Sequence, residues 1–190
     1  MTSTAYDQWQ QIHTDRPWGA WPCEDIVAAC CRHQPDRAAR GYALDIGCGT
    51  GNHLRFLSES GWTPVGLDVP AALDRCPPVR RARFVACDLD DSTTCIEALT
   101  WRPYDLVIDN VSTCYLHEAA AERIYAHLTT TLTPGTLLIV RDFRALPSTH
   151  APAGMRAASW WRKVLRDWGS YKMIPVRTAN AVLWHIEAIR

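Results

Sequence analysis

The chain has 190 residues, enough for one well-packed domain and too few for two of ordinary size. Its 20 basic and 20 acidic side chains cancel, which argues against a protein built mainly to hold nucleic acid. No stretch approaches the roughly 20 uncharged apolar residues of a membrane span. Residues 1–10 lack the basic start and apolar run of a secretory signal, so we expect a cytoplasmic protein without a nucleic-acid or membrane partner.

Eight cysteines occur in the chain. Without a secretory signal they are expected to be reduced thiols, many of them buried as small hydrophobic side chains. Their spacing includes no C-x-x-C pair and no nearby histidine at the distance typical of a zinc site. We therefore expect neither a disulfide framework nor a bound metal.

The elements follow a regular order along the chain. Residues 1–40 are expected to form a helical N-terminal lid over a core formed by residues 41–190, within one domain. From residue 42, short apolar runs alternate with helical stretches, which is typical of a parallel sheet covered on both faces. The pattern predicts strands at Tyr42–Ile46, Pro64–Leu67, Arg83–Ala86, Asp105–Ile108 and Thr136–Arg141, and helices at Gly51–Ser60, Ser92–Thr100 and Glu118–Thr131.

The C-terminal quarter has a different pattern. A loop rich in Pro, Ser and Ala is followed by a predicted helix at Arg156–Trp168, which ends at a glycine. Two strands, Tyr171–Arg177 and Ala181–Ile189, flank a turn at residues 178–180 and are expected to pair antiparallel at the sheet edge. The fold class is therefore α/β, with a mostly parallel seven-stranded sheet, helices on both faces and a C-terminal antiparallel hairpin.

The strongest motif is Ala43-Leu44-Asp45-Ile46-Gly47-Cys48-Gly49-Thr50-Gly51, a buried strand that leads directly into three alternating glycines and then a helix. Glycines allow the backbone to turn sharply and to approach a ligand without an intervening Cβ, and the helix start offers free N–H groups. The motif predicts a site for a nucleotide-like ligand. A purely structural strand, turn and helix is the alternative.

This motif resembles the first motif of class I S-adenosylmethionine-dependent methyltransferases, and the resemblance continues through the chain in order. Asp68 closes the second strand, where the family holds the ribose hydroxyls, and Asp88 follows the third strand, where it binds the adenine amino group. The stretch 104–110 resembles the family's fourth strand, and 132–140 resembles its L-x-P-G-G turn and fifth strand, with Thr136 in place of the second glycine.

The resemblance implies a Rossmann-like fold and S-adenosylmethionine as cofactor, with S-adenosylhomocysteine as product. It also implies a cofactor site at Asp45, Gly47, Cys48, Gly49, Gly51, Asp68, Val69, Asp88, Leu89, Asp109 and Asn110. A dinucleotide-dependent dehydrogenase also carries an acidic residue after its second strand. Its G-x-G-x-x-G fingerprint is absent, because position 52 is Asn.

A second resemblance lies near the N-terminus. Trp9, Pro17-Trp18-Gly19 and Pro22 precede the glycine motif by roughly thirty residues. This pattern is similar to the entry segment of thiopurine, halide and tellurite-type methyltransferases, in which the region folds over the cofactor. Apolar packing of an N-terminal helix is the alternative interpretation.

Candidates for the chemical step lie just beyond the fourth strand, because parallel sheets bind ligands at the carboxyl ends of their strands. We predict Asp109, Tyr115 and His117 as catalytic residues. Many relatives carry two histidines where this chain has Cys114 and Tyr115, so a role as base passes to His117. The alternative for His117 is a surface residue that caps the following helix.

The methyl acceptor is expected to be a small molecule or short peptide that is methylated on O, S or N, with a carboxylate as one hypothesis. Its predicted binding residues are Trp18, Trp21, Tyr115, Arg144, Trp160 and Trp161. The tryptophans of the late helix could equally belong to the core. Two alternative functions stay open: a thiol, halide or metalloid methyltransferase, and a non-catalytic partner subunit that binds S-adenosylmethionine.

Overall fold

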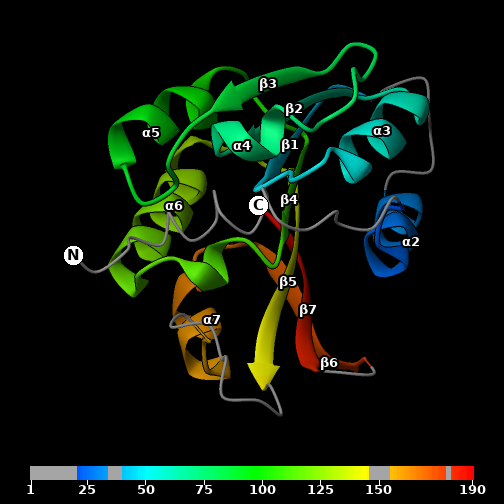
Figure 1. Cartoon of the computed structure of the whole chain (residues 1–190). Coiled ribbons are helices and arrows are strands. Elements are labelled where there is room, and N and C mark those ends of the chain that lie inside the picture. Colours follow the sequence, from blue (N-terminus) through cyan, green and yellow to red (C-terminus); the bar gives the residue numbers. More distant parts are fainter. Residues whose placement is uncertain (1–20, 34–39, 146–154, 179–180) are drawn as a thin grey trace.

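The computed structural model describes residues 21–33, 40–145, 155–178 and 181–190 (Figure 1). Seven strands form one sheet in the order β3-β2-β1-β4-β5-β7-β6. The strands are β1 (Tyr42–Ile46), β2 (Thr63–Asp68), β3 (Arg83–Ala86), β4 (Leu106–Asn110), β5 (Leu137–Ala145), β6 (Ser170–Arg177) and β7 (Val182–Ile189). The helices are α2 (Glu24–His33), α3 (Asn52–Glu59), α4 (Pro70–Leu73), α5 (Ser92–Thr100), η1 (Thr113–Tyr115), α6 (Glu118–Thr131) and α7 (Ala158–Val164).

The first five strands are parallel, β7 pairs antiparallel with β5, and β6 pairs antiparallel with β7. The predicted fold class is therefore confirmed. The chain builds the sheet outward from β1 to β3 and then crosses to β4 on the other side of β1. Such a reversal of strand order places a ligand crevice at the carboxyl ends of β1 and β4.

Helices cover both faces of the sheet (Figure 1), and each face has its own buried apolar cluster. α2 and α3 pack over one face, where Ala43, Leu106 and Ile139 are buried. α5, α6 and α7 lie over the other, where Leu44 and Val107 are buried. Successive residues of the central strands thus point into opposite clusters, which is why these strands are apolar throughout.

β6 forms the exposed edge of the sheet. Most of its side chains are exposed, and it contains Pro175, which an edge strand tolerates because one side of its backbone has no strand partner. Thr178 and Ala181 exchange hydrogen bonds between β6 and β7, in agreement with the predicted tight turn. Residues 179 and 180 of that turn lie outside the described residues.

Four local features differ from the sequence predictions. The fifth strand was predicted at Thr136–Arg141, but β5 continues to Ala145. The short helix α4 and the turn η1 were not predicted, since neither is long enough to show a periodicity. The predicted helix at 156–168 is too long: α7 spans Ala158–Val164. After Val164 the chain continues in tight turns, and Trp168 packs into the core and donates from Nε1 to Thr129 Oγ1 at 3.0 Å. No described helix has the length and apolar character needed to cross a membrane.

Candidate functional site

The loop after β1 has the backbone conformation that its glycines predict. Gly47, Gly49 and Gly51 have φ angles of 67°, 55° and 77°, in the left-handed region that other residues enter only with strain. A Cβ on Gly47 would lie 2.1 Å from Ser112 Oγ, so the loop passes directly against the segment that follows β4. The Ser112 hydroxyl also donates to the Gly47 carbonyl at 3.3 Å.

Asp68, at the end of β2, holds this loop from the other side. Its Oδ2 accepts a hydrogen bond from Gly49 N–H at 2.6 Å, and its Oδ1 accepts one from Val69 N–H at 2.7 Å. Burial raises the pKa of Asp68 to about 6, although the two N–H donors act in the opposite direction. The carboxylate is ionised at neutral pH, and each oxygen keeps a lone pair for a further donor.

Asp45, on β1, is the most unusual carboxylate of the loop. It is completely buried, and within the described residues neither of its oxygens has a hydrogen-bond partner. His53 Nδ1 on α3 lies 3.7 Å from Asp45 Oδ2, which is beyond hydrogen-bond range. An unpaired buried carboxylate is costly, so its position beside the glycine loop fits a site that receives a cationic group from a ligand.

The chain leaves β4 through a strained residue. Val111 has a φ angle of 61°, which is rare for a β-branched residue and costs about 1 to 3 kcal/mol. Its N–H donates to the Arg141 carbonyl of β5 at 2.8 Å. This turn directs Ser112 back toward Gly47 and begins η1, so the strain lies where the segment after β4 meets the glycine loop.

Asp109 anchors this turn with both carboxylate oxygens. Oδ1 accepts from the N–H groups of Ser112 and Thr113 at 3.0 and 3.3 Å, and Oδ2 accepts from the hydroxyls of Thr113 and Tyr125, both at 2.5 Å. Burial raises the pKa of Asp109, and these hydrogen bonds lower it. The carboxylate thus ties β4 to η1 and α6, and its predicted roles in cofactor binding and catalysis stay predictions.

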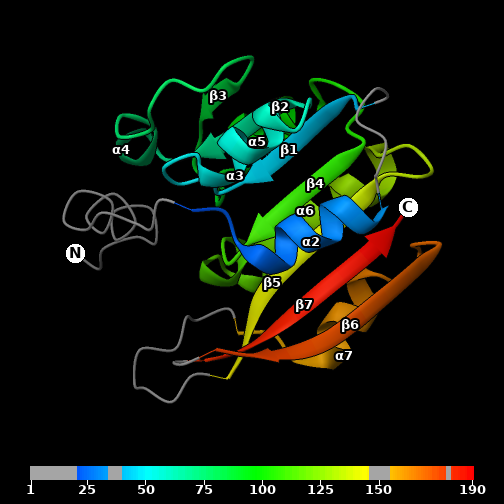
Figure 2. The same ribbon diagram turned by 90° about the vertical axis from the view of Figure 1, so that its right-hand side faces the viewer.

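Asn110 points to the opposite face of the sheet, toward α2. Its Oδ1 accepts from Arg141 Nη1 at 3.3 Å, and the same nitrogen donates to Cys23 Sγ at 2.6 Å. Arg141 Nε lies 3.6 Å from Asp25 Oδ2 on α2. Arg141 therefore connects the end of β4 and the middle of β5 to the start of α2 (Figure 2), which lies close to the ends of the central strands.

The remaining predicted cofactor residues lie along the same sheet edge. Asp88 follows β3, and its Oδ1 accepts from Asp90 N–H at 2.9 Å, which shapes the loop. Leu89, beside it, packs against the buried cluster under α5 and α6. Cys48 is buried, and its N–H donates to the Leu67 carbonyl of β2 at 2.9 Å.

The predicted acceptor residues are more dispersed. Tyr115 is half-buried, with its ring edge-on to Phe143 at 6.3 Å, and burial raises its pKa to about 12, so it is a neutral phenol. His117 is exposed at the N-cap of α6, where its carbonyl accepts the first N–H groups of the helix. Arg144 stacks on the Trp184 ring, with Cζ 4.6 Å from its centroid.

The four tryptophans predicted to bind the acceptor do not share one environment. Trp18 lies outside the described residues, and Trp21 is 86% exposed. Trp160 and Trp161, both on α7, are buried, and both rings contact Tyr125 edge-on. Within the described structure these two rings are part of the core.

Sequence reasoning missed a buried carboxylate on β5. Asp142 is 1% exposed, its Oδ2 accepts from Trp161 Nε1 at 3.0 Å, and burial together with nearby Asp109 raises its pKa to about 7. Arg156 is also buried and donates to the Leu116 carbonyl at 3.4 Å. Asp142 follows the predicted strand Thr136–Arg141, so the sequence pattern did not indicate that it would be buried within β5.

The structure thus brings the glycine loop, Asp45, Asp68 and the end of β4 together at one edge of the sheet. It does not bring His117, Arg144 or the two core tryptophans into this group. The unpredicted members are Ser112, Arg141, His53 and Cys23, all of them joined to the site by the contacts described above. Among the described residues, no cluster of three His, Cys, Asp or Glu side chains could hold a metal ion.

Comparison with known proteins gives one family and many related folds. Residues 13–185 match a family model described as a methyltransferase domain. No curated protein sequence matches the chain.

Three solved structures represent the related folds. The first, from work on the conversion of a disulfide bond into a thioacetal group during echinomycin biosynthesis, is 20% identical with a TM-score of 0.70, and the match covers 98% of this chain and 92% of that one. Magnesium protoporphyrin IX methyltransferase from Synechocystis PCC 6803, solved with SAH bound, is 19% identical with a TM-score of 0.63, over 99% and 95% of the two chains.

An O-methyltransferase family protein from Burkholderia thailandensis is 14% identical with a TM-score of 0.61. That match covers 97% of this chain, which spans 59% of the length of the Burkholderia protein. At these identities the likenesses establish the shared Rossmann-like fold.

Proposed function

We propose that this chain, which belongs to the methyltransferase domain family, transfers a methyl group from S-adenosylmethionine to O, S or N of a small molecule or short peptide. S-adenosylmethionine as methyl donor is supported by the family and by the fold shared with methyltransferases, one of them solved with SAH. The donor and the acceptor are both part of the proposal.

The observation that carries the proposal is the Asp45 carboxylate, which is fully buried beside the glycine loop without a hydrogen-bond partner among the described residues. A buried anion of this kind is stabilised when a cation approaches it. The amino-acid end of S-adenosylmethionine carries an ammonium group, and its sulfonium is also positive. Asp45 therefore suits that end of the cofactor.

Asp68 suits the ribose end. Its two oxygens are fixed by the N–H groups of Gly49 and Val69, so the carboxylate is preorganised and loses little freedom when two hydroxyl groups bind to it. Asp88 lies one strand further along the same edge, where it suits the adenine amino group. The order of the three carboxylates across β1, β2 and β3 agrees with the order of the cofactor's parts in this proposal.

When bound, S-adenosylmethionine supplies an electrophilic methyl group, so the protein has to align the acceptor and exclude water. Tyr115 offers a neutral phenol for a hydrogen bond to the acceptor. A carboxylate or thiolate acceptor needs no base, and the exposure of His117 at the start of α6 agrees with such an acceptor.

The test has two stages. Calorimetric titration with S-adenosylhomocysteine measures cofactor binding to the wild type and to Asp45→Asn, which keeps the shape of the side chain and removes its charge. We expect the variant to bind at least tenfold more weakly, since it loses a charge-assisted contact. Equal affinity of the two proteins would remove Asp45 from the site.

Release of S-adenosylhomocysteine is then measured from S-adenosylmethionine and a panel of carboxylic acids, thiols, amines and phenols. Halides and metalloid oxyanions form a second panel, which tests the N-terminal resemblance. Turnover with a member of the first panel is the expected result. Cofactor binding without turnover on either panel would favour a non-catalytic binding subunit.

A further inference from the structure

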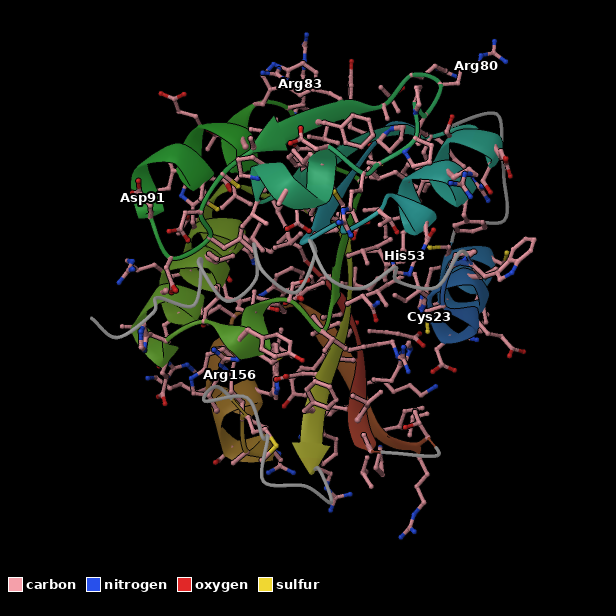
Figure 3. All side chains as sticks on the ribbon, in the orientation of Figure 1. Cys23, His53, Arg80, Arg83, Asp91 and Arg156 are labelled. Carbon is pink, nitrogen blue, oxygen red and sulfur yellow. The ribbon has the colours of Figure 1, made fainter. Side chains whose placement is uncertain are left out.

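His53 lies against both the buried Asp45 carboxylate and the start of α2. It is the second residue of α3 and is itself buried. Its Nε2 accepts a hydrogen bond from the backbone N–H of Cys23 at 3.2 Å, and its Nδ1 lies 3.7 Å from Asp45 Oδ2. Figure 3 shows His53 and Cys23 between α3 and α2.

The contact with Cys23 fixes the proton on the ring. A backbone N–H can only donate, so Nε2 must present its lone pair, and in the neutral ring the proton then resides on Nδ1. The Nδ1–H group therefore faces Asp45. If Cys23 moved away, Nε2 could carry the proton, and an Nδ1 lone pair facing the carboxylate would be repelled by it.

Cys23 is held at a second point. Its Sγ accepts a hydrogen bond from Arg141 Nη1 at 2.6 Å, and Arg141 is in turn joined to Asn110 at the end of β4. The start of α2 thus rests on two groups that belong to the ligand edge of the sheet. We call Cys23 seated when both of these contacts are made.

We propose that His53 is a positioning residue that couples cofactor binding at Asp45 to the seating of Cys23 at the start of α2. Seating of Cys23 directs the Nδ1–H group at Asp45 Oδ2 and so orients the carboxylate toward the ligand edge. A ligand that binds the oriented carboxylate in turn favours the tautomer whose Nε2 accepts from Cys23. Because such coupling is reciprocal, each event strengthens the other by the same factor.

The proposal rests on the proposed function, because it assumes that the ligand at Asp45 is S-adenosylmethionine or its product. One hydrogen bond to the imidazole ring transmits the effect, so the coupling factor is expected to be about threefold to tenfold. The factor is measurable from either side, as cofactor affinity or as protection of Cys23.

Two amide variants divide the functions of the ring. In His53→Gln the longer amide can reach the position of Nε2 and accept from Cys23, while the donor facing Asp45 is lost. In His53→Asn the shorter amide can place a donor near the position of Nδ1, while the acceptor for Cys23 is lost. Both variants are polar and similar in size, so they control for each other's effect on folding, which circular dichroism checks.

The readout is the alkylation rate of the Cys23 thiol by iodoacetamide, followed by peptide mass spectrometry with and without S-adenosylhomocysteine. Cys31 lies on α2, which begins directly after Cys23; it is exposed and serves as the internal control. In the wild type the ligand should slow alkylation of Cys23 about threefold to tenfold and leave Cys31 unchanged. In His53→Gln, Cys23 should react as slowly as in the free wild type, and in His53→Asn faster, with the ligand protection lost in both.

The possible outcomes separate the two proposals. A wild type that binds no S-adenosylhomocysteine by calorimetry would overturn the proposed function and this coupling with it. A wild type that binds the ligand but shows no protection of Cys23 would overturn the coupling alone. Protection that persists unchanged in both amide variants would also overturn it, since the ligand would then cover Cys23 without the aid of His53.

Discussion

Replacing Asp68 by Asn is the sharpest test of the site, because the change removes a charge and keeps the shape. The wild-type carboxylate accepts one backbone N–H on each oxygen, from Gly49 at 2.6 Å and from Val69 at 2.7 Å. An amide has a single oxygen, so one of these two donors must face an NH2 group. The variant thus weakens the hydrogen bonds that hold the glycine loop and removes acceptors for the ribose hydroxyls.

The expected loss follows from the number and type of these contacts. Replacing a charged acceptor by a neutral one costs about 1.5 to 3 kcal/mol, which corresponds to a loss of affinity of roughly tenfold to a hundredfold. Calorimetric titration with S-adenosylhomocysteine at pH 8 measures this loss. The matched control is Asp74→Asn, an exposed aspartate at the end of α4, which should bind as the wild type does.

The pH dependence provides a second arm. Burial raises the pKa of Asp68 to about 6, so the wild-type carboxyl is ionised above that pH and accepts protons as the pH falls through it. A protonated carboxyl has lost the charge that the Asn variant also lacks. The affinity gap between wild type and variant should therefore be widest at pH 8 and shrink at pH 5. Equal affinities at pH 8 would refute the role assigned to Asp68.

Three further changes test the surroundings of the site. Gly47→Ala should weaken S-adenosylhomocysteine binding more than tenfold, because the residue has φ 67° and its new Cβ would clash with the Ser112 hydroxyl. The control is Gly135→Ala, at φ 92° with open space around the Cβ, which has the strain without the clash and should bind normally. Asp142→Asn should raise the free energy of unfolding at pH 8 by about 2 to 4 kcal/mol in urea titrations, because the pKa of the native carboxyl is raised to about 7. The gain should fade toward pH 4, where the native carboxyl is protonated. Tyr125→Phe should lower the free energy of unfolding by about 1 to 3 kcal/mol, since Asp109 loses a buried hydroxyl donor, and unchanged urea midpoints would show that this hydrogen bond contributes nothing.

The apolar periodicity of the sequence and its glycine and proline breaks were sufficient to predict the architecture. Each of the seven predicted strands exists, and the helices at Ser92–Thr100 and Glu118–Thr131 have the predicted bounds. These elements depend on local causes, because apolar runs, helix periods and glycine or proline breaks act within a few residues of one another. The glycine motif was equally local: its three positive φ angles are a property of residues that follow a strand directly.

The polar contacts at the ligand edge could only be decided by the tertiary structure. His53 is an ordinary helix residue in the sequence, and nothing nearby indicates that it joins Cys23, thirty residues earlier, to Asp45. Asp109 was predicted near the reactive centre, but only the packing of α6 shows that Tyr125 and Thr113 occupy its oxygens.

Helix α7 is a second case in which the sequence left two environments open and the tertiary structure decided between them. Two adjacent tryptophans in the sequence are consistent both with an acceptor pocket and with a core, because either environment favours large apolar rings. Trp160 and Trp161 are buried because α7 docks on the sheet at β5 and β7, where Asp142 accepts the indole N–H of Trp161. Composition and period therefore determined which residues form strands and helices, whereas the partners of each buried polar group depended on strand order and helix docking, which bring distant residues within hydrogen-bond range.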